Sequence, residues 1–174
     1  MTVKREKKGK KRPCKFRPDK KTLETIIRRV QLVDIILLDS STKRIKEDIN
    51  YNDLTIQTKS IAQTGEEEPP GKTFMGICEF GVRGMLENEG VEPIEAFIIE
   101  GSFLLTYILK DREGITTDDI ASFVVINGEH QVWPFWRELV HNMSSRMGIE
   151  PITLPIRQPR YKLSELVIEE TEDL

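Results

Sequence analysis

Few residues of this 174-residue chain have a type and spacing that could support catalysis. The neighbouring carboxylates Asp118 and Asp119 could exchange protons with a substrate, but acids at a helix start are explained more simply by the helix dipole. His130 and His141 have no cysteine or acid at metal-ligand spacing, so we expect no metal site. The Gly-Lys pair in "PPGKTF" lacks the earlier glycine of a phosphate-binding loop. We therefore predict no enzyme activity and no cofactor.

Charge is divided between a basic arm and an acidic remainder. Residues 1–21 hold eleven Lys or Arg and two acids, a net charge of +9, whereas the remainder holds fifteen basic and twenty-seven acidic residues, a net charge of −12. The arm has no periodicity, so we expect residues 1–21 to be disordered and residues 22–174 to form one domain. Such an arm could bind RNA or an acidic partner, or it could be a solvated tail. We favour the tail, so nucleic acid is not expected as a partner.

The sequence predicts a cytoplasmic protein. The apolar stretch over residues 23–39 is interrupted by charged residues, which argues against a signal peptide. No stretch approaches the roughly 20 apolar residues that a membrane-spanning helix needs. Cys14 and Cys78 suggest no disulfide framework, which suits a reducing compartment.

Four apolar segments separated by turns predict an antiparallel sheet. The segments are residues 25–39, 53–63, 73–85 and 94–109. The absence of a helical pattern between them favours antiparallel strands over the helical crossovers of a parallel sheet. Successive side chains of a strand face opposite sides. The last segment would therefore place aromatic residues such as Phe97 and Phe103 on one face, and Ile98 with Glu100 on the other.

The helices are expected at the end of the chain. We predict one from Thr117 to Ile126, a second from Pro134 to Gly148, and a third near residues 161–172. The second carries an apolar stripe at spacings of three and four residues, formed by Trp136, Leu139, Val140, Met143 and Met147. The predicted fold is therefore α+β. So little helix would leave the aromatic face of the last strand for a second subunit to cover.

Three motifs in the second half of the sequence carry a resemblance to a known family. An acid, Glu100, lies within an apolar strand in "EAFIIEGSFLL", and "WPFWRE" begins the long helix at residue 133. Ser145 and Arg146 near the end of that helix are followed by the extended segment "PITLP". Together these motifs resemble the SecB family of bacterial protein-export chaperones, over roughly residues 27–170.

The resemblance implies both a fold and a function. The fold would be a four-stranded antiparallel sheet with a long helix and a C-terminal helix, assembled as a homotetramer from two dimers. SecB-like proteins hold unfolded preproteins without ATP and pass them to the export motor SecA. Related SecB-like chaperones instead guard the antitoxin of a toxin–antitoxin pair, and the sequence excludes neither client. An adaptor that binds RNA or an acidic partner through the basic arm is the competing interpretation.

Motor contacts in the family fall on one face of the sheet. By resemblance they correspond to Asp34, Ile98 and Glu100. A further family acid falls near Leu38, where this chain has its acid, Asp39, one residue later. In a regular strand that step would place Asp39 on the wrong face or require a shifted register.

Client contacts and subunit contacts are also implied by the resemblance. The client groove would be lined by Leu54, Ile56, Ile152, Leu154, Tyr161, Leu163 and Leu166, each of which could equally be ordinary core. The oligomer interface would contain Phe97, Ile99, Phe103, Trp136, Leu139, Val140, Met143 and Met147.

Overall fold

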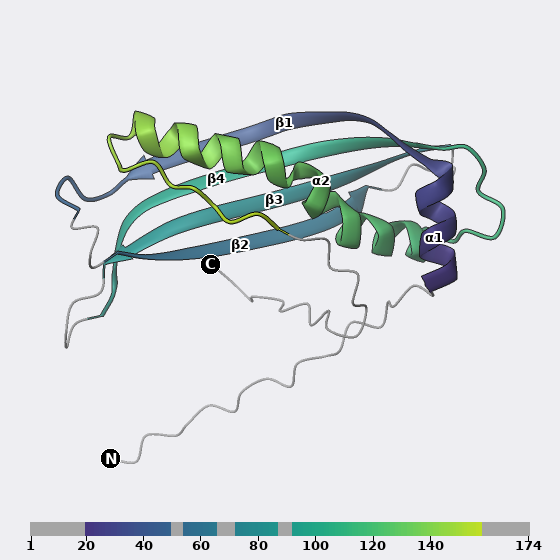
Figure 1. The fold of residues 1–174 in the computed structure, drawn as a ribbon, viewed down its shortest axis with the longest axis horizontal. Coiled ribbons are helices and arrows are strands. Elements are labelled where there is room, and N and C mark those ends of the chain that lie inside the picture. Colours follow the sequence, from purple (N-terminus) through teal and green to yellow (C-terminus); the bar gives the residue numbers. More distant parts are fainter. Residues whose placement is uncertain (1–19, 50–53, 66–71, 87–91, 158–174) are drawn as a thin grey trace, which may run out of the picture.

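The computed structural model describes residues 20–49, 54–65, 72–86 and 92–157. Its elements are α1 (Lys20–Arg29), β1 (Val30–Arg44), β2 (Leu54–Gly65), β3 (Thr73–Leu86), β4 (Ile94–Leu109) and α2 (Thr117–Arg146). The four strands form one antiparallel sheet in the order β1-β4-β3-β2, and α2 lies across one face of it (Figure 1). The predicted α+β fold with a four-stranded antiparallel sheet and a long helix is confirmed. The expected basic arm, except its last two residues, and the expected C-terminal helix lie outside the described residues.

The first predicted strand begins later than expected. Residues 25–29 belong to α1, and β1 begins only at Val30. The helix buries Ile26 completely, and Arg28 and Arg29 in its last turn favour the negative end of the helix dipole. A short apolar run fits either a helix or a strand, so periodicity alone could not place this boundary.

The two helices expected between residues 117 and 148 are a single 30-residue helix, α2. Thr116 caps its start in a capping box with Asp119, which gives one member of the acid pair a structural role. Gly128 does not end the helix but lets it approach the sheet, because a Cβ there would lie 3.1 Å from the Cys78 sulfur. Gly148, at a φ of +67°, follows the helix where its end was predicted.

The core lies between α2 and the aromatic face of the two central strands. Trp136 stacks on Phe80 with ring centroids 5.4 Å apart, and Phe80 meets Phe103 edge to face at 6.0 Å. Gly101 of β4 allows this close approach, since a Cβ there would lie 3.1 Å from Trp136. The aromatic face of β4 is therefore covered within one chain.

That covering corrects the expectation that a second subunit must bury the aromatic face. The physical reason is the length of α2, which continues through Gly128 and Pro134 where the sequence suggested a break. Five of the proposed interface residues are consequently buried in the core of the single chain, namely Phe97, Ile99, Phe103, Trp136 and Val140. Leu139, Met143 and Met147 are only partly buried, so their contact with a second subunit stays a prediction.

Candidate functional site

The face of the sheet opposite α2, here called the open face, carries the three residues expected to contact a motor. Side chains directly opposite each other in an antiparallel pair share a face. Asp34 lies opposite Thr106, and Glu100 lies opposite Gly81 and Ser41. Ile98 is two residues before Glu100 in β4 and therefore lies on the same face. The three residues share one face of the sheet, which the sequence predicted for Ile98 and Glu100, and their role there stays a proposal.

Asp39 also reaches the open face, because β1 is irregular. The register of β1 against β4 shifts between Leu37 and Asp39, so that Leu38 is an extra residue and Asp39 lies opposite Ser102. A similar shift between Leu32 and Asp34 makes Val33 extra. Such β-bulges insert one residue and change which side chains face which side. Of the two alternatives that the sequence left for Asp39, the shifted register is the one that occurs.

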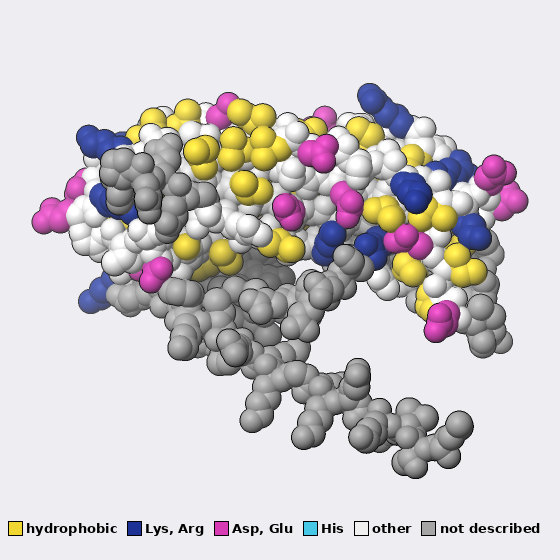
Figure 2. Space-filling model, turned by 180° about the vertical axis from the view of Figure 1, so that it is seen from behind, with side chains coloured by type: hydrophobic (Ala, Val, Ile, Leu, Met, Phe, Trp, Pro, Cys, Tyr) yellow, Lys and Arg dark blue, Asp and Glu magenta, His cyan; other side chains and the backbone are white. Residues whose placement is uncertain are grey.

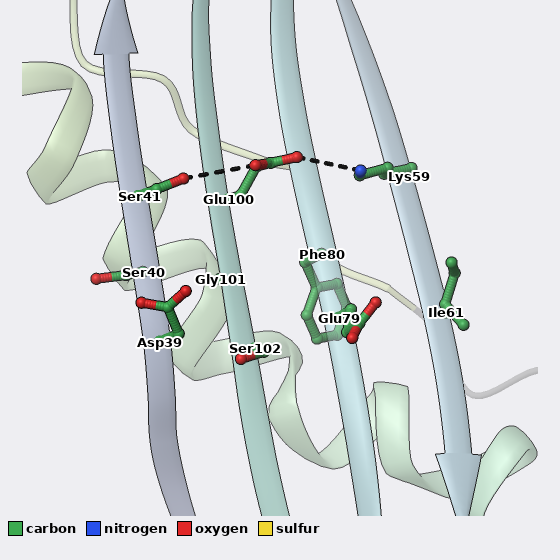
Figure 3. Close-up of a pocket in the computed structure, with 10 residues that line it drawn as sticks. All are labelled: Asp39, Ser40, Ser41, Lys59, Ile61, Glu79, Phe80, Glu100, Gly101 and Ser102. Atoms are coloured by element: carbon green, nitrogen blue, oxygen red, sulfur yellow. Dashed lines mark hydrogen bonds and ion pairs between the residues drawn. The ribbon is translucent and has the colours of Figure 1, made fainter. Parts of the chain in front are cut away.

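Glu100 is engaged by two residues that the sequence did not single out. Lys59 Nζ lies 3.1 Å from Glu100 Oε1, and the Ser41 hydroxyl donates to Glu100 Oε2 at 3.5 Å (Figure 3). Lys59 reaches from β2 across β3 because Gly81 has no side chain there, and a Cβ at Gly81 would lie 2.7 Å from Lys59 Cε. Both side chains of this ion pair are more than a third exposed, so its contribution to stability is small.

A shallow hollow of about 210 Å³ surrounds this ion pair on the open face. It is lined by Asp39, Ser40, Ser41, Lys59, Ile61, Glu79, Phe80, Glu100, Gly101 and Ser102 (Figure 3). Three carboxylates face a single ammonium group in it, so the hollow carries excess negative charge. Figure 2 shows apolar side chains and acidic groups interspersed across the same face. The surface suits a partner with both apolar and basic side chains.

The expected client-groove residues lie on the other side of the sheet. Leu54 and Ile56 of β2 lie opposite Leu86 and Gly84 and face the α2 side. Ile56 is 37% exposed, whereas Leu54 packs partly against the core. The two residues therefore border the α2 layer, with Ile56 accessible to a bound polypeptide.

The extended segment after α2 contributes less open surface than predicted. Ile152 is partly buried, but Leu154 is only 3% exposed and belongs to the core. For Leu154 the ordinary-core interpretation is therefore the correct one in the single chain. Tyr161, Leu163 and Leu166 lie outside the described residues.

Side chains of α2 hold this segment by its backbone. Trp133 Nε1 donates to the carbonyl oxygen of Pro155 at 2.9 Å, and Arg137 Nε donates to that of Leu154 at 2.7 Å. The Ser144 hydroxyl accepts from the backbone N–H of Ile152 at 3.0 Å. None of these roles was predicted from the sequence. The signal for Trp133 was available, since an indole N–H buried in a core needs an acceptor.

Cys78 is the free cysteine of the described chain, and it is not suited to nucleophilic chemistry. Burial, together with the smaller effect of the nearby charge of Glu129, raises the pKa of its thiol from 9.0 to about 12. At neutral pH the residue is therefore a protonated, apolar group of the core. Burial likewise raises the pKa of Tyr107, whose hydroxyl donates to Gln131 Oε1.

The described ranges contain neither a candidate metal site nor a candidate membrane span. No group of three His, Cys, Asp or Glu side chains there could hold a metal ion. None of the helices described is both long and apolar enough to cross a membrane.

The comparisons with known proteins agree with the motif resemblance. No family model matches the chain. The protein-export proteins SecB of Wolbachia pipientis wMel and of the Wolbachia strain wRi from Drosophila simulans are each 24% identical over 120 residues, covering 68% of this chain and 70% of theirs. A solved SecB-like chaperone of Mycobacterium tuberculosis, in complex with a ChAD peptide from the HigA1 antitoxin, matches with a TM-score of 0.71. That match covers 80% of this chain and 98% of the other at 16% identity, and it confirms the SecB-like fold.

Proposed function

We propose that this chain, a SecB-family protein, is an ATP-independent chaperone that holds an extended, unfolded polypeptide segment. The observation that carries the proposal is the α2 side of the sheet. There Ile56 stands partly exposed, and α2 holds an extended segment through that segment's main-chain carbonyls. Burial of apolar client side chains would supply about 25 cal/mol per Å² before the cost of ordering the client. Recognition of main-chain groups and apolar surface suits clients of varied sequence.

An antitoxin is the client that the comparisons support best. The SecB-like chaperone that shares this fold over 98% of its length was solved with an antitoxin peptide. Binding of one extended antitoxin segment needs only the α2 side of the sheet. We therefore propose an unfolded or partly folded antitoxin as the primary client.

Export of preproteins is the second candidate, and the open face favours it. The sequence relatives are protein-export proteins, and the bulges of β1 bring Asp34 and Asp39 onto the same face as Glu100. A cluster of acids among apolar residues would dock a basic, apolar segment of a motor. Binding of SecA by this face, and loss of that binding in Glu100→Lys, would favour export over antitoxin protection.

We also propose that the chain assembles as a homotetramer of two dimers. β1 is an edge strand, and in the described chain it pairs with β4 alone. Large apolar residues are exposed along it, namely Val33, Ile36, Leu37 and Leu38. A long apolar edge strand is a template for pairing with another chain. Its pairing would form dimers, and Leu139, Met143 and Met147 of α2 would contribute to the contact between dimers.

The function is tested by holding an unfolded client without nucleotide. The purified full-length protein should suppress aggregation of a chemically unfolded protein at about one tetramer per client, with no ATP present. The same protein should form a stable complex with a peptide from an antitoxin, if one is encoded beside it. Absence of both activities would overturn the proposal. A cytoplasmic location stays a prediction.

A further inference from the structure

We propose that residues 149–157, here called the strap, occupy in the client-free chain the place that a client segment takes, and must leave it when a client binds. The strap follows α2 and runs back along that helix on the same side of the sheet (Figure 1). This inference rests on the proposed chaperone function and adds a competitor that is built into the chain.

The contacts to the strap are of the kind that a binder of varied sequences needs. Trp133 and Arg137 bond to the carbonyl oxygens of Pro155 and Leu154, which any polypeptide would present. Ser144 accepts the N–H of Ile152 in the same way. Groups that hold main-chain atoms recognise an extended conformation and not a particular side chain. The set of donors on α2 therefore fits a client segment as well as it fits the strap.

The side chains of the strap alternate as those of a bound extended peptide do. Leu154 is 3% exposed and enters the core between the exposed residues Thr153 and Pro155, and Ile152, two residues before it, is partly buried. One apolar anchor with neighbours in solvent is what a groove for extended segments accepts. A client with an apolar residue at the same spacing could replace Leu154 without rearrangement of α2.

Arg157 fastens the end of the strap and joins α2 to β2. Its guanidinium lies 4.1 Å from the ring centroid of Trp133 and forms an ion pair with Glu129. It also donates to the hydroxyl of Ser60 in β2 at 3.4 Å. The side chains of Arg157 and Glu129 are about a quarter exposed, so water and competing ions reach this latch. A fastening of this kind is strong enough to favour the closed strap and weak enough to release it.

Release of the strap would enlarge the surface offered to a client. The seat of Leu154 and the ring of Trp133 would become accessible from the side of the sheet where Ile56 already stands exposed. A client that carries an apolar residue followed by a basic one would take both the seat and the contacts of Arg157. Apolar and basic segments are accordingly the best competitors for the strap.

The first test follows hydrogen exchange of the strap in the full-length protein. The N–H groups of Ile149 and Ile152 are bonded to Ser144 in the closed strap, so they should exchange slowly without client. Saturation with reduced, carboxymethylated α-lactalbumin, a permanently unfolded protein, should speed exchange over residues 149–157 at least tenfold. Slower or unchanged exchange would overturn the proposal, because a strap that merely lines the groove would be protected by client or left as it was.

The second test opens the latch. Arg157→Gln and Glu129→Gln should each speed exchange of the strap without client, and Arg157→Gln, which leaves Glu129 available to a client, should tighten binding of the unfolded α-lactalbumin about fivefold. Arg83→Gln is the matched control, since it removes an ion pair of similar exposure, to Glu95, on the open face. It should change neither quantity. Weaker or equal client binding by Arg157→Gln, or unchanged exchange of the strap in both variants, would contradict the proposal.

The two tests separate the strap from the chaperone function. If the wild-type protein binds no unfolded client, the proposed function fails, and with it the displacement by client. Hydrogen exchange without client still tests whether the contacts of Arg157 with Glu129 and Trp133 hold the strap closed. If client binds but exchange of the strap does not rise, the function stands and the strap proposal alone is wrong.

Discussion

The central strands and the edge strand β1 belong to the same sheet, but their side chains are buried to different degrees. On β3 and β4 the residues facing α2 are buried, and aromatic rings such as Phe80 and Trp136 fill the space between sheet and helix. On β1 most residues are exposed on both faces, although the strand is 15 residues long and rich in Ile, Leu and Val. The difference indicates that the single chain completes its core under α2 and leaves β1 available to other molecules.

The largest expected effect is a loss of stability in the core beneath α2. Trp136→Ala should lower the free energy of unfolding by about 3–5 kcal/mol, because it empties a fully buried site beneath α2. Phe135→Ala is the control, since Phe135 is the next residue of the same helix and is 48% exposed. It should change stability by less than about 1 kcal/mol. Urea unfolding measures both, and equal losses would contradict the division between core and surface.

Self-association through β1 is tested by placing a charge on that edge strand. Leu38→Lys places an ammonium group at the exposed bulge of β1, where lysine discourages strand pairing. It should weaken self-association at least tenfold and leave the thermal midpoint of the monomer unchanged. Ile108→Lys, at an exposed position of β4 on the open face, should leave association intact. Light scattering over a dilution series measures the association. If both variants associate like the wild type, the proposed pairing is contradicted.

Two glycines of β3 sharpen the contrast between the two faces. A Cβ at Gly84 would overlap the buried ring of Phe97, so Gly84→Ala should cost about 1–3 kcal/mol of stability. A Cβ at Gly81 would meet only the flexible end of Lys59 on the open face. Gly81→Ala should therefore cost less than about 1 kcal/mol, because Lys59 can move aside. Calorimetry of the two variants measures both losses of stability. A greater loss for Gly81→Ala than for Gly84→Ala would contradict this difference between the two faces.

The smallest expected effect comes from the buried thiol of Cys78. Its pKa is raised from 9.0 to about 12, so the folded chain keeps a proton that the unfolded chain releases as pH rises above 9. Stability from this group is full below pH 9 and is lost progressively towards pH 12. Between pH 8 and 10 the loss should be about 1 kcal/mol. Cys78→Ala should flatten this alkaline decline in urea unfolding. A wild-type stability that is constant to pH 10 would contradict the assignment.

Much of the fold was predictable because the strand patterns are strong. The bounds of β4 agree with the sequence at both ends, since alternation of side chains continues from Ile94 to Leu109. The continuity of α2 was not predictable. Glycine is common just after the end of a helix, so Gly128 suggested a helix end. Only its contact with Cys78 across the core explains why α2 continues.

The candidate site was predictable in part. Alternation placed Ile98 and Glu100 on one face, and the register of the sheet confirms this. The position of Asp39 depended on a bulge at Leu38, which pairing with β4 imposes and which local sequence does not show. The partners of Glu100 and of the strap come from residues far away in the chain, such as Lys59 and Trp133, so they required the tertiary structure.

Two isoleucines of β2 test whether clients bind on the α2 side of the sheet. Ile56 is 37% exposed and faces that side, whereas Ile61 is 42% exposed and lines the hollow of the open face. The measurement is the affinity of Ile56→Asp and Ile61→Asp for a permanently unfolded protein, with circular dichroism and light scattering as checks of fold and assembly. We expect at least a tenfold loss for Ile56→Asp and wild-type affinity for Ile61→Asp. Equal affinities of the two variants, or a loss confined to Ile61→Asp, would contradict client binding on the α2 side.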